Sequence, residues 1–150
     1  MKFEHKATIP APIDKVWAFL MDVPRVATCA PGVDSVEDIG DNKYRGTIKV
    51  AVGPIRLNLQ GDVSITERDD AAHKASMRAD AADKRAGGAV KAIMSMALTQ
   101  TTDNANSTEL LMETDAQVMG RIGEFGQPVI QRKADQLMAQ FAECLARTLA

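Results

Sequence analysis

The sequence predicts an α+β fold in which a curved antiparallel sheet of seven strands wraps around a long C-terminal helix, with two short helices after the first strand. Two periodicities lead to this fold. Between residues 33 and 118, apolar and polar residues alternate as in strands that have one buried face. From residue 121 to the end, apolar residues recur with the period of an amphipathic helix. The length of 150 residues suits a single domain, residues 1–150.

The opening segment predicts a strand followed by two short helices. Residues 2–9 alternate, which places four side chains on one face of a strand: Phe3, His5, Ala7 and Ile9. Pro12 suits the first turn of a helix because its missing N–H is not needed there. That helix has one apolar stripe, made of Ile13, Val16, Trp17 and Leu20. Asp22 is expected to cap a second helix, which ends at the turn Pro31-Gly32.

Six further strands are expected after Gly32, because turn-forming residues interrupt the alternation. The expected strands are Val33–Ile39, Tyr44–Val52, Ile55–Thr66, Ala71–Asp83, Val90–Thr101 and Thr108–Val118. The turn signals are Gly40-Asp41-Asn42, Gly53-Pro54, Gly87-Gly88 and the loop Asp103–Asn106. Alanine favours helices, so residues 71–97 have a helical alternative. The polar alternation and the Gly87-Gly88 pair favour strands.

The C-terminal segment predicts the element that covers the apolar face of the sheet. One long helix is expected from Arg121, with Pro128 as either a kink or a new first turn. Small residues at inward strand positions leave space instead of filling it: Gly46, Gly61, Ala75, Ala79, Ala92 and Ala116. The eight methionines add flexible side chains of the kind that line adaptable binding surfaces. Together these features predict an internal apolar cavity.

Composition and charge exclude several classes of protein. With a net charge of −2, the chain lacks the excess of basic residues that is typical of a nucleic-acid-binding protein. No apolar run is long enough to span a bilayer, and the charged segment 1–6 does not resemble a signal peptide. Cys29 and Cys144 lie far apart without metal or redox spacing, so we expect a cytoplasmic protein with reduced cysteines.

The histidines and Cys29 are the candidates for chemistry. His5 and His73 have no partner at a recognised metal-ligand spacing, so a structural role is expected for both. Cys29 is interpreted as a small buried residue beside a turn. The alternative is a nucleophile, which requires His5 or another electropositive group nearby.

Basic residues suggest two possible contacts with anions. Arg25 either is solvated or pairs with Asp22, and its guanidinium would also suit the carboxylate or phosphate head group of a ligand. The segment 84–88, with Lys91, predicts a basic hairpin tip. This tip is either a solvated turn or a contact for an acidic partner or an anionic lipid.

Motifs along nearly the whole chain form a recognisable set. They are Ile9-Pro10-Ala11-Pro12 running into Val16-Trp17 and Leu20, Asp22 followed by Pro31-Gly32-Val33, Tyr44-Arg45-Gly46 leading to Lys49-Val50, Val52-Gly53-Pro54-Ile55, Gly61, the stretch 114–118, and Gly120 with Gly123. This set resembles the CoxG family, the G subunit of carbon monoxide dehydrogenase, within the START-like, polyketide cyclase-like helix-grip superfamily. The resemblance implies an accessory protein without catalysis of its own. Its implied partner is a molybdenum-hydroxylase-type dehydrogenase, with peripheral contact at the inner face of the membrane.

The resemblance and the inward residues together predict a site for a quinone-like or fatty-acid-like molecule, with no covalently bound cofactor and no metal. The predicted lining is Arg25, Cys29, Leu57, Leu59, Met77, Met94, Met96, Met112, Phe125 and Val129. Two alternatives stay open. One is an enzyme of the cyclase or hydrolase type, and the other is an interaction domain with a solid core.

Overall fold

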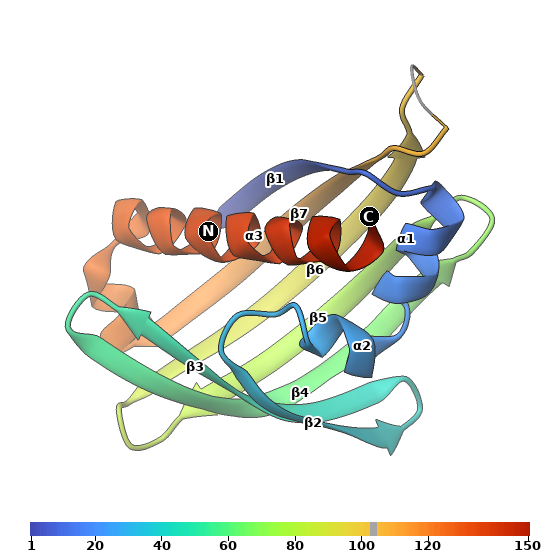
Figure 1. The fold of residues 1–150 in the computed structure, drawn as a ribbon. Helices are drawn as coiled ribbons and strands as arrows, with labels where there is room; N and C mark the ends of the chain where they lie inside the picture. The colour runs from blue at the N-terminus through green and yellow to red at the C-terminus, as the bar shows by residue number, and fades with distance from the viewer. Residues whose placement is uncertain (103–104) are drawn as a thin grey trace.

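The computed structural model describes residues 1–102 and 105–150, and its elements follow the expected order (Figure 1). They are β1 (Lys2–Ile9), α1 (Ile13–Leu20), α2 (Val23–Ala27), β2 (Val33–Gly40), β3 (Lys43–Val52), β4 (Ile55–Asp69), β5 (Lys74–Asp83), β6 (Gly88–Gln100), β7 (Thr108–Gly120), the 3-10 helix η1 (Arg121–Phe125) and α3 (Gln127–Leu149). The predicted fold class is confirmed. The helical alternative for residues 71–97 is excluded, because strands occupy most of that range. Two residues of the expected loop Asp103–Asn106 lie outside the described residues.

All seven described strands form one antiparallel sheet with the order β1-β7-β6-β5-β4-β3-β2. Strands β2 to β7 each pair with their neighbours in sequence, and β1 joins the edge beside β7. The alternation sets the register, since a slip by one residue would turn every apolar side chain outward. As a result, Val63, Ala79 and Ala92 lie in register across β4, β5 and β6.

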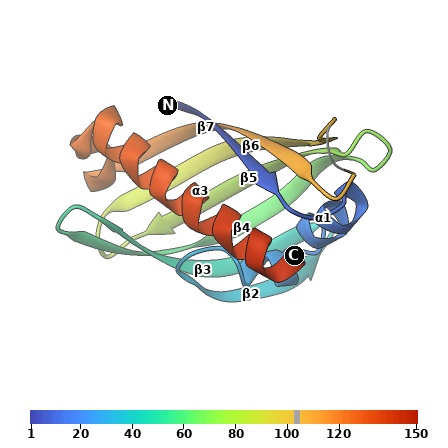
Figure 2. The same ribbon diagram turned by 45° about the horizontal axis from the view of Figure 1, so that its top comes forward.

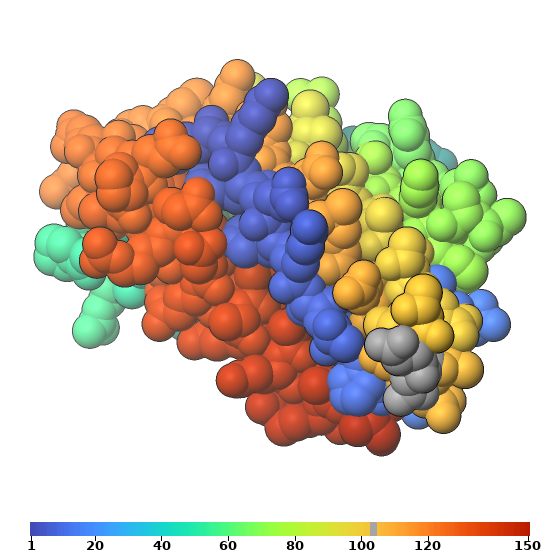
Figure 3. All heavy atoms as spheres, turned by 90° about the horizontal axis from the view of Figure 1, so that it is seen from above, coloured from blue at the N-terminus to red at the C-terminus, as the bar shows by residue number. Residues whose placement is uncertain are grey.

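Helix α3 lies across the concave face of the curved sheet (Figure 2). It contacts β1 at one edge of the sheet and β3 towards the other. Strand β1 and α3 come from opposite ends of the chain, and their surfaces lie side by side (Figure 3). Four residues of α3 are buried on its apolar stripe: Ile130, Phe141, Leu145 and Leu149.

The start of the C-terminal segment differs from the single helix expected from Arg121. Residues 121–125 form η1, which is separated from α3 by Gly126 with a φ of 76°. Glycine adopts this conformation at little cost, whereas other residues are strained in it. Helix α3 begins at Gln127 with Pro128 in its first turn. The interpretation of Pro128 as a new first turn is therefore confirmed.

The buried apolar residues form two separate clusters along α3. We call the first the α1 cluster, because it joins Val16, Phe19 and Leu20 of α1 to the C-terminal half of α3 around Leu145. We call the second the η1 cluster, because it joins Ile122 of η1 to the start of α3 at Ile130. Its other buried members are Phe3, Val52, Leu57, Leu59 and Ala116. The core is thus divided between the two ends of the long helix.

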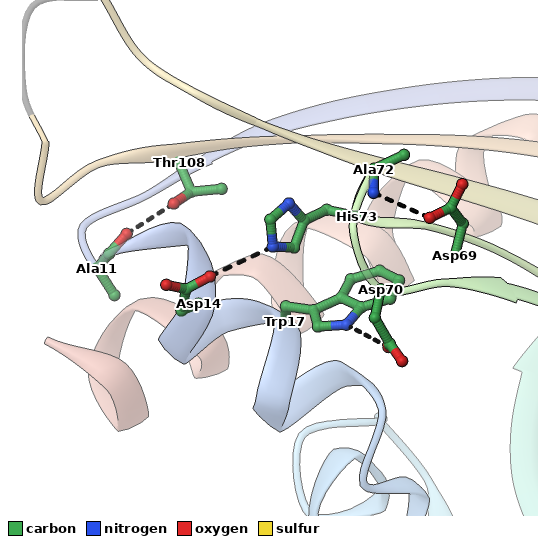
Figure 4. A network of polar contacts seen from close by, with 8 residues as sticks. All are labelled: Ala11, Asp14, Trp17, Asp69, Asp70, Ala72, His73 and Thr108. Atoms are coloured by element: carbon green, nitrogen blue, oxygen red, sulfur yellow. Dashed lines mark hydrogen bonds and ion pairs between the residues drawn. The ribbon is translucent and has the colours of Figure 1, made fainter.

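Polar contacts fix α1 against the sheet (Figure 4). The hydroxyl of Thr108 donates a hydrogen bond of 2.7 Å to the backbone carbonyl of Ala11, and both residues are buried. On the far side of α1, the indole N–H of Trp17 donates to Asp70 at 2.9 Å. These bonds link the segment just before α1 to β7, and α1 itself to the β4–β5 turn.

We expect Thr108→Val to lower the free energy of unfolding by about 1–3 kcal/mol, because valine keeps the shape but leaves a buried carbonyl without its donor. Urea denaturation would measure this loss. Thr8→Val, at an exposed position of β1, is the control and should change the stability little. Equal stabilities of the two variants would contradict the assigned role of the Thr108 hydroxyl.

Candidate functional site

The middle of the interior is lined by apolar side chains that belong to neither cluster. Val63 on β4 and Ala79 on β5 are register partners. Leu137 lies on α3 between Ala134, which packs against the η1 cluster, and Phe141, which belongs to the α1 cluster. All three side chains remain half-buried, although close-packed cores bury such residues almost completely. We call this region the central section.

The predicted lining residues are distributed around the central section instead of forming one surface. Met96, Met112 and Cys29 are buried in the α1 cluster, and Met77 and Met94 pack against it half-buried. At the other end, Leu57 and Leu59 are buried in the η1 cluster, with Phe125 and Val129 against it. The methionines therefore border the central section on one side and the leucines border it on the other.

Helix α2 and Arg25 lie at the surface. None of the five residues of α2 is buried. The guanidinium of Arg25 stacks over the ring of Phe19, 5.0 Å from its centroid, and is not paired with Asp22. Asp22 occupies the N-cap position, but its side chain makes no capping hydrogen bond, so this part of the prediction is wrong. The guanidinium of Arg25 therefore interacts with the ring of Phe19 instead of with the carboxylate of Asp22.

A disulfide joins Cys29 to Cys144, with their Cα atoms 5.3 Å apart. The prediction of two reduced cysteines is therefore wrong, and so is the alternative of a free nucleophile at Cys29. The two residues are separated by 115 positions, and only the packing of the segment after α2 against the end of α3 brings them together. The bond links the segment after the surface helix α2 to α3, the helix that lies across the sheet.

A pocket of about 160 Å³ lies between β1 and α3, on the side seen in Figure 3. His5 Nε2 lies 2.8 Å from Asp135 Oδ1, which also accepts a hydrogen bond from the amide of Gln131. Hydrogen bonding to His5, and then to Gln131, lowers the pKa of Asp135 from its usual value. These hydrogen bonds connect the edge strand β1 to α3.

His73 belongs to the structure around α1 (Figure 4). Its Nε2 lies 3.3 Å from Asp14, and its ring packs edge-on against Trp17 at 5.5 Å between centroids. In the described part of the chain, no group of three or more His, Cys, Asp or Glu side chains is placed to hold a metal ion. The structural role expected for His73 fits both contacts.

A larger pocket of about 650 Å³ lies where β4 parts from β5. Pairing of these strands begins at Gln60 and Ala82, so the first residues of β4 pair with β3. Asp83, which is 8% exposed, lines the gap. One of its carboxylate oxygens accepts the N–H of Asn58 at 2.7 Å, and the other accepts two N–H groups of the β5–β6 turn at 3.0 Å. These bonds, that from Asn58 first, hold the pKa of Asp83 below its usual value.

Among the described residues, no helix combines the length and the apolar character needed to cross a bilayer.

Comparison with known families gives one assignment. The model of the CoxG family, described as the G subunit of carbon monoxide dehydrogenase, matches residues 6–150. A search of curated proteins finds no significant match.

Solved structures share the fold over nearly the whole chain. A conserved protein from Geobacillus kaustophilus has a TM-score of 0.89 at 20% identity, with 99% of this chain and 95% of that chain covered. A START superfamily protein from Mycobacterium smegmatis has a TM-score of 0.73 at 9% identity, covering 99% and 96%. The Zhui aromatase/cyclase from Streptomyces sp. R1128 has a TM-score of 0.70 at 18% identity, covering 99% and 93%. These likenesses identify the fold as START-like.

We expect loss of the disulfide to lower the free energy of unfolding by about 2–5 kcal/mol, because the bond closes a long loop and restricts the unfolded chain. The double variant Cys29→Ser/Cys144→Ser and the wild type in reductant should both show this loss in urea denaturation. The double variant itself should not respond to reductant. If reductant also leaves the wild type unchanged, the bond does not form in solution.

We expect the carboxylate of Asp83 to make stability depend on pH. Because its pKa is lowered in the folded state, its contribution is present above the pKa of the unfolded chain, about 4, and is lost as pH falls through the folded value. Thermal unfolding from roughly pH 5 down to roughly pH 2 should therefore show a smaller acid-induced loss for Asp83→Asn than for the wild type. Asp41→Asn, in an exposed turn, is the control. Parallel curves for all three proteins would contradict this role.

Proposed function

We propose that this chain, which belongs to the CoxG family of carbon monoxide dehydrogenase G subunits, is a non-catalytic accessory protein that binds a hydrophobic small molecule between α3 and the sheet. One observation carries the proposal. Val63, Ala79 and Leu137 face the interior between two well-packed clusters and yet stay half-buried. An apolar ligand there would remove this surface from water, at roughly 25 cal/mol per Å².

The chemistry of the central section favours a long, mostly apolar ligand. The half-buried methionines Met77 and Met94 adjoin it, and their flexible thioethers adapt to rings and to alkyl chains. Small residues widen the space at the same level, since Ala79 lies opposite Ala92. A quinone-like or fatty-acid-like molecule fits these properties. It would be held by burial, without a covalent bond or a metal.

The partner in this proposal is a carbon monoxide dehydrogenase, the enzyme that the family description names; the resemblance in the sequence implies the molybdenum-hydroxylase type. The proposed location is the cytoplasm, with peripheral contact at the inner face of the membrane. Reduced cysteines would have supported this location, but the disulfide removes that support because disulfides are typical of oxidising compartments. The location therefore follows from the proposed partner.

Binding is favoured over catalysis by the position of the polar groups. Some proteins of similar fold are described as an aromatase/cyclase and as norcoclaurine synthase. In this chain the pairs His5–Asp135 and His73–Asp14 join elements of the scaffold to one another. The central section between the clusters is lined instead by apolar side chains such as Val63 and Leu137.

Native mass spectrometry of the purified protein, followed by denaturing extraction, tests the proposal directly. A retained quinone or fatty acid, or a mass shift when either is added, is the expected result. A mass equal to that of the chain alone, with no shift on addition, would overturn the binding function.

We expect Ala79→Leu to distinguish an open central section, which we call the chamber, from a solid core. In an open chamber the larger side chain fits, so stability should change by less than about 1 kcal/mol while ligand retention falls; a close-packed core would lose about 1–3 kcal/mol. Ala82→Leu, three residues along β5 on the opposite face, is the matched control and should retain the ligand. Urea denaturation and native mass spectrometry give the two readouts. A large destabilisation by Ala79→Leu alone would contradict the chamber.

A further inference from the structure

We infer that the pocket between β4 and the β5–β6 turn is a binding site for a phosphate-type oxyanion. Its lining combines three cationic side chains, Lys49, Arg56 and Arg85, with one carboxylate, that of Asp83. The pocket lies beside the η1 cluster and not in the central section, so the inference stands whether or not the chamber binds a ligand.

The cations reach the pocket from three different segments of the fold. Lys49 comes from β3, Arg56 from β4 and Arg85 from the turn after β5. Within the described part of the chain, neither arginine forms an ion pair with a carboxylate, and both are exposed. Lys49 contacts Asp34 at 3.3 Å in an exposed pair, which is readily exchanged for another anion. Guanidinium groups match the oxygens of a phosphate in pairs.

Asp83 offsets part of this positive charge, because Arg85 interacts with its carboxylate, but its main partners are backbone N–H groups. Its carboxylate oxygens accept three backbone N–H groups, from Asn58, Arg85 and Ala86. The side chain is buried in those bonds, whereas the guanidinium groups extend into solvent. Asp83 thus shapes the turn that presents Arg85 and leaves the cations available to a ligand.

The unpaired start of β4 adds hydrogen-bond donors. The side-chain amide of Asn58 is exposed and lines the pocket. In a strand, the N–H groups that point to one edge recur at every second residue. Since the N–H of Asn58 points into the gap towards Asp83, the N–H of Arg56 points to the same edge. Cationic and neutral donors therefore converge on one region.

The floor of the pocket and its size define the class of ligand. Val50, Leu57 and Ala86 supply apolar surface, and Leu57 is buried in the η1 cluster. The volume of about 650 Å³ exceeds the space that one phosphate ion fills and lies in the range of small-molecule sites. The ligand is therefore a phosphate ester, either a free small molecule or the head group of a lipid.

The test compares Arg56→Gln/Arg85→Gln with Arg132→Gln/Arg147→Gln, which removes the same charge from exposed positions of α3. Two-dimensional NMR would follow each protein with inorganic phosphate against chloride at constant ionic strength. Vesicles of phosphatidylcholine, with and without phosphatidylglycerol, would be tested by co-sedimentation. We expect the pocket variant to raise the Kd of the probe that binds by roughly 10-fold or more, and the α3 variant to leave it within about 2-fold.

The two arms distinguish the sources of the phosphate. Saturable shifts at Asn58 and Arg85 with inorganic phosphate, lost in the pocket variant, support a free phosphate ester. Binding to phosphatidylglycerol vesicles alone, with the same loss, supports a lipid head group. Equal responses of the two variants, or no response to either probe, would overturn the site. Thermal unfolding of both variants checks that the fold is retained.

Discussion

One helix must cover a sheet of seven strands, and the rest of the structure depends on this mismatch in size. The six spacings between the strands add up to a width of about 29 Å, whereas a helix with its side chains is about 10 Å wide. Helix α3, with 23 residues, therefore cannot bury the whole concave face. Burial is complete where a second element adds side chains, as Phe19 of α1 does at one end and Ile122 of η1 at the other. Between these ends, Val63 and Ala79 are covered by α3 alone and stay half-buried.

Polar and covalent links hold the helices where apolar contact is limited. The His5–Asp135 contact fastens α3 to the edge strand β1, and the bond from Trp17 to Asp70 fastens α1 to the β4–β5 turn. The disulfide from Cys29 holds the segment after α2 to α3. Because α3 is held at Asp135 and at Cys144 in these ways, its position does not depend on close packing around Leu137. An interior that can accept a ligand is compatible with an ordered helix above it.

Much of the fold could be predicted because it follows from local patterns. Strand alternation identified the strands and the inward face of Ala79, and the helical period identified the last helix. The break at Gly126 was missed, because the apolar stripe continues through η1. The disulfide could not be predicted, since the sequence does not show that Cys29 and Cys144 meet. The larger pocket depends on where β4 starts to pair with β5, which alternation does not determine. Only its basic turn, with Arg85, was visible in the sequence.

The two proposed sites are separated by the η1 cluster. On β4, Leu57 contributes to the floor of the pocket between β4 and the β5–β6 turn. The next inward positions of β4 are Leu59, Gly61 and Val63, and Val63 lies in the central section. Six residues of strand correspond to about 20 Å, and Leu57 and Leu59 fill the first part of that distance. A phosphate group in the pocket is therefore not the head group of a short ligand in the chamber. Entry to the chamber is better sought on the side of α2, where no residue of the helix is buried and the disulfide is its covalent link to α3.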